Sequence, residues 1–154
     1  MSALKSLSLA IELSVIKRDQ ALAQLQKTVQ AHAFAQDQQQ QLQQYAHETD
    51  ARWTRSGQAG TTPELMQHHY QFMGRLTQAI ALQDGVLSGT TQRVEAAKQV
   101  LLQAEFRLAS LKQVLASRQA DLAKSQQRRE QKQMDEFAAL QTQRHKRIQA
   151  ENNV

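Results

Sequence analysis

The residues of this 154-residue sequence that are best suited to chemistry are its histidines. His68 and His69 are adjacent, and neighbouring side chains on a helix point about 100° apart, so this pair does not form a face with two metal ligands. His47 could approach them only if the chain folded back on itself. The absence of cysteine removes thiolate metal sites, disulfides and thiol nucleophiles, and suits a reducing compartment. These residues predict no metal site and no cofactor.

The acidic residues nearest the C-terminus do not predict catalysis either. Glu130, Asp135 and Glu136 belong to a charged helical stretch and have no concave site in which to act as general acid or base. The chain also lacks a phosphate-binding loop, a nucleophile elbow and a zinc motif. We therefore expect no enzymatic activity.

The net charge of +5 and the isoelectric point near 9.8 raise the question of nucleic-acid binding. Basic and acidic residues alternate along most of the chain, as they do on a solvated helix face. Only the C-terminal part is biased towards basic residues, namely Lys124, Arg128, Arg129, Lys132, Arg144, Lys146 and Arg147. Because Phe137 is the one phenylalanine, tyrosine or tryptophan among these bases, stacking platforms are scarce and nucleic acid is a disfavoured partner.

The elements that must position these side chains are revealed by a seven-residue repeat. Such a repeat keeps one narrow apolar stripe facing a partner helix in a left-handed coiled coil. The first row of the repeat is Met66, Met73, Ile80, Leu87, Val94, Leu101, Leu108, Leu115 and Leu122. A second row, three residues further on, is Leu76, Gln83, Thr90, Ala97, Ala104 and Leu111. The next position of the first row is Arg129, so the stripe ends there.

Composition agrees with a coiled coil. Apolar residues make up 40% of the chain but aromatic residues only 5%, which is too few for an ordinary layered core. No apolar run approaches the roughly 18 residues of a membrane span, so no such span is expected. The mildly apolar start of the chain continues into a charged helical pattern and is interpreted as helix rather than as a signal peptide.

The helix breakers cluster at one place, between Gly57 and Pro63. Gly57 suits the position after a helix, where a positive φ is needed, and Thr62 suits the N-cap before Pro63. We therefore predict an all-α fold, an antiparallel two-helix coiled-coil hairpin whose second helix is the longer. The first helix would cover residues 1–56, the loop 57–62 and the second helix 63–150, with roughly 120–150 projecting beyond the paired region.

If the helices pair in this way, facing residue numbers should add to about 119. This register gives the first helix a seam of its own, made of Ile11, Val15, Leu22, Leu25 and Val29. It also places His32 opposite Leu87. On the first helix, the register places three glutamines opposite Ile80 and Gln83, namely Gln36, Gln39 and Gln43. The two helices should therefore pack weakly against each other at this level.

Three large apolar residues lie off that seam near the loop: Leu42, Tyr45 and Phe72. They either add packing between the two helices or form an exposed anchor patch for another protein, since aromatic anchors carry much of the energy of protein interfaces. The register alone leaves both interpretations open.

The run from Arg128 to Ala138 resembles the C-terminal signature of the FliJ family of flagellar export proteins, roughly R-x-E/D-Q-K-x-x-D-E-x-A. Further matches are Gln41-Leu42 with Tyr45 and Glu48, the glycine loop, and Tyr70, Phe72, Leu76, Ala79 and Ile80. The resemblance covers roughly residues 10 to 145. Thr49 departs from it, because the family often has tyrosine at that position.

The resemblance implies a non-enzymatic cytoplasmic component of flagellar type III export, peripheral to the basal body at the inner membrane and similar to the central stalk of rotary ATPases. Its partners would be the export ATPase FliI with its regulator FliH, the cytoplasmic domain of the gate protein FlhA, and export chaperones. Carried over by position, the gate-binding residues would be Gln38, Leu42, Tyr45, Phe72, Leu76, Ala79 and Gln83. The projecting segment would contact the ATPase ring through Arg128, Arg129, Gln131, Lys132, Asp135 and Glu136. Leu76 and Gln83 also fall on seam positions, where they would pack inward.

Three other functions are compatible with the same pattern. The equivalent stalk of a virulence injectisome shares the architecture, and the neighbouring genes would distinguish it. A basic hairpin that binds nucleic acid would do so with a steep dependence on salt. A generic self-associating coiled coil would form a concentration-dependent dimer through the unpaired segment.

Overall fold

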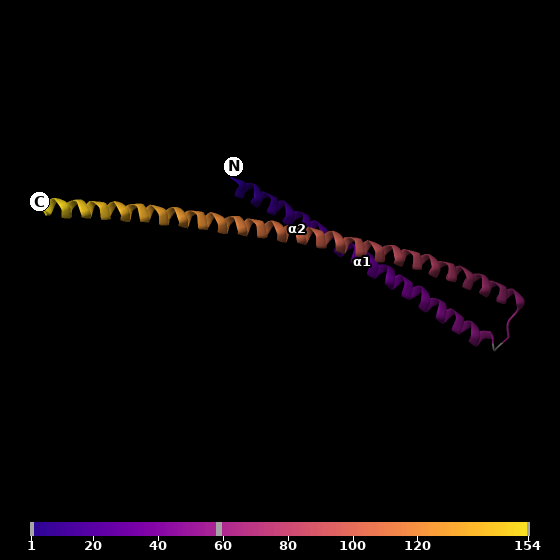
Figure 1. The fold of residues 1–154 in the computed structure, drawn as a ribbon. Coiled ribbons are helices and arrows are strands. Elements are labelled where there is room, and N and C mark those ends of the chain that lie inside the picture. Colours follow the sequence, from indigo (N-terminus) through magenta and orange to yellow (C-terminus); the bar gives the residue numbers. More distant parts are fainter. Residues whose placement is uncertain (1, 58–59, 154) are drawn as a thin grey trace. The chain divides into compact units, whose positions relative to one another are not determined.

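The computed structural model describes residues 2–57 and 60–153, and over these ranges it consists of two α-helices without strands (Figure 1). Helix α1 covers Ala3–Gly57 and helix α2 covers Pro63–Asn152. The predicted all-α hairpin with a longer second helix is confirmed. Gln58 and Ala59 of the predicted loop lie outside the described residues. Neither helix, as far as described, has a stretch long and apolar enough to cross a membrane.

The start of each helix is capped by a side-chain hydroxyl. The Ser2 hydroxyl accepts a hydrogen bond from the Lys5 N–H at 3.2 Å, and the Thr62 hydroxyl accepts one from the Leu65 N–H at 3.3 Å. Thr62 is therefore the N-cap of α2, as predicted. The prediction for Gly57 is wrong: it is the last residue of α1, and the positive φ among the described residues is at Gly60, at 94°.

The chain divides into two compact units, and each is described by itself. One unit is Ser14–Phe106, the hairpin unit, in which α1 and α2 run antiparallel from the loop (Figure 1). The other combines Met1–Leu13 of α1 with Arg107–Val154, the C-terminal half of α2.

The seam that α2 contributes to the hairpin unit is the predicted one. Leu76, Thr90 and Ala97 are buried, at 8%, 6% and 7% exposure. The other members of both rows are half-buried: Met73, Ile80, Gln83, Leu87, Val94, Leu101 and Ala104. Met66, next to the loop, is 39% exposed. The heptad repeat therefore identified the buried face of α2 along the hairpin.

The predicted seam of α1 is only partly correct. Leu25 and Val15 are half-buried, but Leu22 and Val29 are 41% and 46% exposed. Their places are taken by a row of mostly small residues that begins one position earlier, Ser14, Ala21, Thr28 and Ala35. Short side chains let two helix backbones approach closely, whereas the larger Leu22 and Val29 are pushed to the edge of the contact.

Contacts between the helices confirm the antiparallel register. The ring of Tyr45 meets that of Phe72, and Trp53 stacks on His69. The residue numbers of these pairs add to 117 and 122, close to the predicted 119. His32, however, hydrogen-bonds through Nδ1 to the hydroxyl of Thr90 at 2.8 Å rather than facing Leu87 alone.

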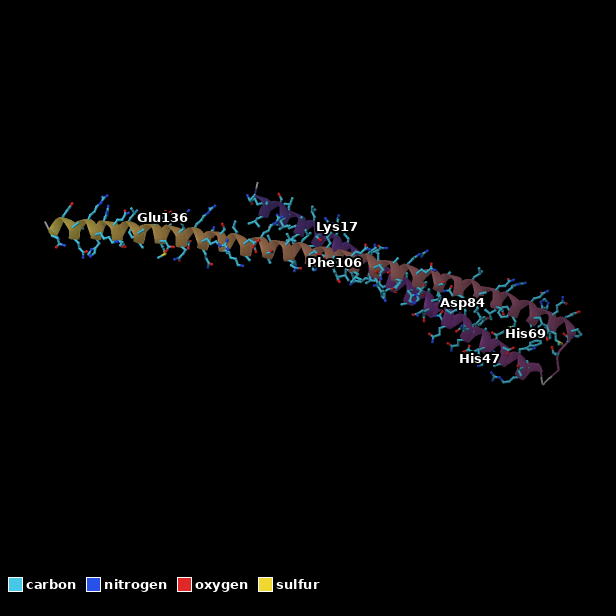
Figure 2. All side chains as sticks on the ribbon, viewed as in Figure 1. Lys17, His47, His69, Asp84, Phe106 and Glu136 are labelled. Atoms are coloured by element: carbon cyan, nitrogen blue, oxygen red, sulfur yellow. The ribbon has the colours of Figure 1, made fainter. Side chains whose placement is uncertain are left out.

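The other unit has a short paired part and a long exposed part. Leu4, Leu7 and Ile11 of α1 are half-buried, and on α2 Leu108 is 4% exposed with Leu111 and Leu115 half-buried. Every described residue after Leu115 is exposed. Figure 2 shows the side chains around Glu136 pointing outward on all sides of α2. The apolar residues in this stretch of α2 therefore have no partner within their own unit.

Candidate functional site

The first candidate site lies on one side of the hairpin unit near the loop and is centred on two aromatic rings. Tyr45 of α1 and Phe72 of α2 make an edge-to-face contact with ring centroids 6.1 Å apart and planes at 81°. Both remain accessible, with 47% and 38% of their surface exposed. Next to them is a shallow groove of about 490 Å³, lined by Gln38, Gln41, Leu42, Tyr45 and Gln83. The arrangement offers apolar rings beside amide groups, as protein-binding surfaces often do.

Not every residue predicted for gate binding reaches this surface. Leu76 is only 8% exposed, and Ala79 is half-buried. The Gln83 amide donates to the backbone carbonyl of Ala35 at 2.9 Å and to Gln38 Oε1 at 3.5 Å, so it is held in the seam. The expectation of inward packing is confirmed for Leu76, whereas Gln83 lies in the seam and also lines the groove.

Leu42 was expected off the seam, and this is wrong. It belongs to the same heptad row as Ala35 and Thr49, and it is half-buried. The Thr49 hydroxyl is buried without a hydrogen-bond partner, so this side chain turns towards the partner helix. Of the predicted set, Gln38, Tyr45 and Phe72 form the exposed part of the surface, with Leu42 and Ala79 at its inner edge.

The middle of the hairpin seam is polar, at the place where glutamines were predicted. Of the three predicted there, only Gln39 is buried, at 6% exposure, while Gln36 and Gln43 are exposed. The Gln39 amide donates to the Asp84 carboxylate, but its Oε1 has no hydrogen-bond partner. A buried amide oxygen without a partner costs about 1–3 kcal/mol, so pairing is weakened at this level.

The histidines near the loop contribute packing. His69 lies flat on the Trp53 ring, with centroids 4.2 Å apart and planes within 6°. Its Nε2 is 3.9 Å from Asp50 Oδ1. Figure 2 labels His47 on α1 and His69 on α2, towards the loop end of the hairpin. Within residues 2–57 and 60–153, no three histidine or carboxylate side chains are grouped closely enough to hold a metal ion.

The second candidate site lies on the exposed stretch of α2, where the structure places all six residues predicted for ring binding at the surface. Gln131 donates to Asp135 Oδ1 at 3.2 Å, one turn along the helix. At about 100° per residue, the six share a sector of roughly 160° on one side of the helix. They are Arg128, Arg129, Gln131, Lys132, Asp135 and Glu136.

The opposite side of the same stretch carries a stripe of exposed apolar residues, interrupted by Arg144, that the heptad repeat does not predict. Met134, Phe137, Leu140 and Ile148 are 68%, 63%, 61% and 54% exposed. Helical geometry places these four within a sector of roughly 120°, away from the charged set. The sequence does show these apolar residues at helical spacing. They were missed because they do not belong to the two heptad rows of the hairpin seam, the first of which ends at Arg129. We call this set the C-terminal stripe.

The comparisons with known proteins agree with this geometry of two helices with exposed surfaces. The family model of the flagellar FliJ protein matches residues 4–147, which is nearly the whole chain. No curated protein and no solved structure matches the sequence. The chain therefore belongs to the FliJ family, whose members are non-enzymatic components of flagellar type III protein export.

Proposed function

We propose that this protein couples the export ATPase to the export gate by binding both, with a different surface for each. The observation that carries the proposal is that two exposed surfaces lie in two separate units of the chain. One combines Tyr45 and Phe72 in the hairpin unit, and the other is the amphipathic stretch of α2 after Leu115. Aromatic and apolar side chains exposed in this way are typical of protein-binding surfaces.

The ATPase contact is assigned to the stretch of α2 around Arg128–Ala138. A helix that has no partner within its own unit, with the six predicted ring-binding residues on one side and the C-terminal stripe on the other, suits insertion into a ring of subunits. The C-terminal stripe would supply apolar contacts, and the charged set would fix orientation. The regulator FliH would reach the protein through the same ATPase assembly.

Charge reversal tests the ATPase assignment. The double variant Arg128→Glu/Arg129→Glu should abolish stimulation of FliI ATP hydrolysis, because it places two negative charges where two positive ones belong. The matched control is Lys112→Glu/Arg118→Glu, which reverses two exposed charges on α2 outside the FliJ signature. Unchanged stimulation by the first variant would show that the ring binds elsewhere.

The gate contact is assigned to the surface around Tyr45 and Phe72. The variant Tyr45→Ala/Phe72→Ala should lose saturable binding to the cytoplasmic domain of FlhA while its circular dichroism remains helical. The matched control is Tyr70→Ala/Phe106→Ala, which removes two exposed aromatic rings from α2 away from the groove. Failure of the wild-type chain to bind FlhA would refute the gate assignment.

The two proposed contacts also suggest where the protein lies in the cell and how it meets export chaperones. A protein held by the ATPase and the gate would lie at the cytoplasmic side of the basal body. From there it could also receive export chaperones. Co-purification of the wild-type chain with a chaperone, lost in one of the two surface variants, would say which surface the chaperone uses.

A further inference from the structure

In the hairpin unit, basic and acidic residues lie mostly on opposite sides, although they alternate along the sequence. It contains eight lysines and arginines and eight aspartates and glutamates. The second seam row is the row of Ala21 and Ala35 in α1 and the row of Thr90 and Ala97 in α2. The charged residues at the heptad positions beside this row are almost all basic. Six of the eight basic residues lie there, with one acidic residue, Glu48: Lys17, Lys27, Arg52, Arg55, Arg75 and Arg93.

The other side of the hairpin unit is acidic. The first seam row is the row of Leu25 and Gln39 in α1 and the row of Leu87 and Val94 in α2. The heptad positions beside this row carry five of the eight acidic residues and one basic residue, Lys98. The five are Asp19, Asp50, Asp84, Glu95 and Glu105. Figure 2 labels one residue from each side, Lys17 and Asp84. We call the two sides the basic flank and the acidic flank.

Contacts between the helices establish which positions share a flank. The Tyr45–Phe72 contact and the Gln83–Gln38 hydrogen bond join the two helices on the basic flank. On the acidic flank, Asp84 accepts a hydrogen bond from Gln39 of the other helix. Residues seven apart lie on the same side of each helix, so the remaining charged residues can be assigned to one flank or the other by their heptad positions.

The basic flank also continues the apolar surface around Tyr45 and Phe72. Phe34, Leu82 and Val86 are 63%, 75% and 50% exposed and occupy heptad positions on this flank. Phe34 and Leu82 lie at the same level of the hairpin, because their residue numbers add to 116, close to the sums of the pairs in contact. The groove lined by Gln38, Leu42 and Gln83 lies between this level and the Tyr45–Phe72 pair.

Basic residues frame this apolar strip at both ends. Arg52 and Arg55 lie towards the loop, and Lys27 and Arg93 lie towards the other end of the unit. Arg75 lies between the levels of Phe72 and Leu82. Within residues 2–57 and 60–153, no carboxylate lies within 4.0 Å of any of the five. Like charges on one flank repel each other in the free protein, and an acidic partner would relieve that repulsion.

We propose that the basic flank receives a helix of the export gate's cytoplasmic domain, with apolar residues along its centre and acidic residues at both ends. The inference rests on the proposed gate binding and adds the chemistry of the partner and five further contact residues: Lys27, Phe34, Leu82, Val86 and Arg93. The flank between two helices is where a third helix packs, with Phe34 and Leu82 on its two sides. The basic ends steer the acidic partner and fix its orientation.

The test measures association and dissociation rates of the full-length chain with the FlhA cytoplasmic domain over a range of salt concentrations. Lys27→Glu/Arg93→Glu should slow association about tenfold and remove most of its salt dependence. Its matched control is Lys98→Glu on the acidic flank. Phe34→Ala/Leu82→Ala should speed dissociation about tenfold, and its matched control is Leu22→Ala/Leu102→Ala, two exposed leucines away from the basic flank. Circular dichroism of each variant verifies that the helices are intact.

The outcomes separate this inference from the proposed function. If the wild type binds and Tyr45→Ala/Phe72→Ala does not, but the charge variant and Phe34→Ala/Leu82→Ala bind like the wild type, gate binding stands and the inference is wrong. If the wild type does not bind FlhA at all, both are wrong. If the charge variant instead abolishes self-association or binding of a single-stranded oligonucleotide, the basic flank has another occupant and the inference is also wrong.

Discussion

Residues 63–106 and the residues after Leu115 belong to one helix, α2, yet they differ in what their apolar side chains do. In the hairpin unit, Leu76 and Ala97 are covered by α1. After Leu115 every described residue is exposed, including Phe137 and Met134. A helix of this kind takes its stability from packing of its apolar face. The two stretches therefore have the same secondary structure and different sources of stability.

The difference teaches how function is distributed along the helix. Where the seam is filled, only the flanks are available to partners, and binding must use residues such as Tyr45 and Phe72. In the described stretch after Leu115, α2 has no second helix against it within its own unit, so its whole circumference is available there and a partner can surround it. We expect the two stretches to differ in local stability, in response to mutation and in the kind of partner they bind.

Hydrogen exchange should reveal the largest difference between them. Amides between Leu76 and Ala97 should exchange at least about 100-fold more slowly than amides around Phe137, because opening the seam costs free energy that opening an unpartnered helix does not. Mass spectrometry of exchanged peptides measures both in one sample. Addition of the export ATPase should slow exchange around Phe137 selectively. Equal protection of both stretches in the free protein would contradict the comparison.

Substitution of a buried leucine should have the next largest effect. Leu76→Ala removes an 8% exposed side chain from the seam and should destabilise the hairpin by about 2–3 kcal/mol. The matched control is Leu82→Ala on the same helix, which removes a 75% exposed side chain and should change stability by no more than about 0.5 kcal/mol. Urea unfolding followed by circular dichroism measures both. Similar losses would mean that the hairpin seam is not the source of stability.

The seam of α2 could be predicted from sequence because a single strict heptad repeat of apolar residues runs along it. The seam of α1 could not be predicted in full, because two neighbouring rows of residues were both plausible. The row with Leu22 and Val29 is the more hydrophobic, and the row with Ala21 and Ala35 is the one that is buried. Hydrophobicity ranks side chains by their transfer from water, but close approach of two backbones selects small ones.

The candidate sites were predictable to different extents. The spacing of Tyr45 and Phe72 in the register predicted that they gather, and they are in contact. The segregation of charge onto two flanks was not predicted. Along the chain, basic residues such as Lys27 alternate with acidic residues such as Asp19, so neither sign stands out in any one segment. The segregation becomes visible only when the rows of two helices are combined. The C-terminal stripe was missed because its frame differs from that of the hairpin seam.

A smaller effect should come from the buried amide in the middle of the hairpin. Gln39→Leu replaces an amide whose Oε1 has no partner with an apolar side chain of similar size, and it should stabilise the hairpin by about 1 kcal/mol. Asp84 is exposed, so water can replace the lost hydrogen bond. The exposed Gln36→Leu is the matched control and should change little. A loss of stability in Gln39→Leu would show that the bond to Asp84 outweighs the unpartnered oxygen.

The smallest effect concerns the glycines inside α2. A Cβ added at Gly85 meets no atom within 4 Å, and the backbone there is helical. Gly85→Ala should therefore stabilise the hairpin by about 0.5–1 kcal/mol, since alanine loses less backbone freedom on folding. The contrasting variant is Gly60→Ala, where space is also free but φ is 94°, so the hairpin should lose about 1 kcal/mol. Opposite signs in urea unfolding would identify backbone conformation as the cause. If Gly85→Ala also weakened gate binding while raising stability, flexibility at this level of the hairpin would be part of the binding mechanism.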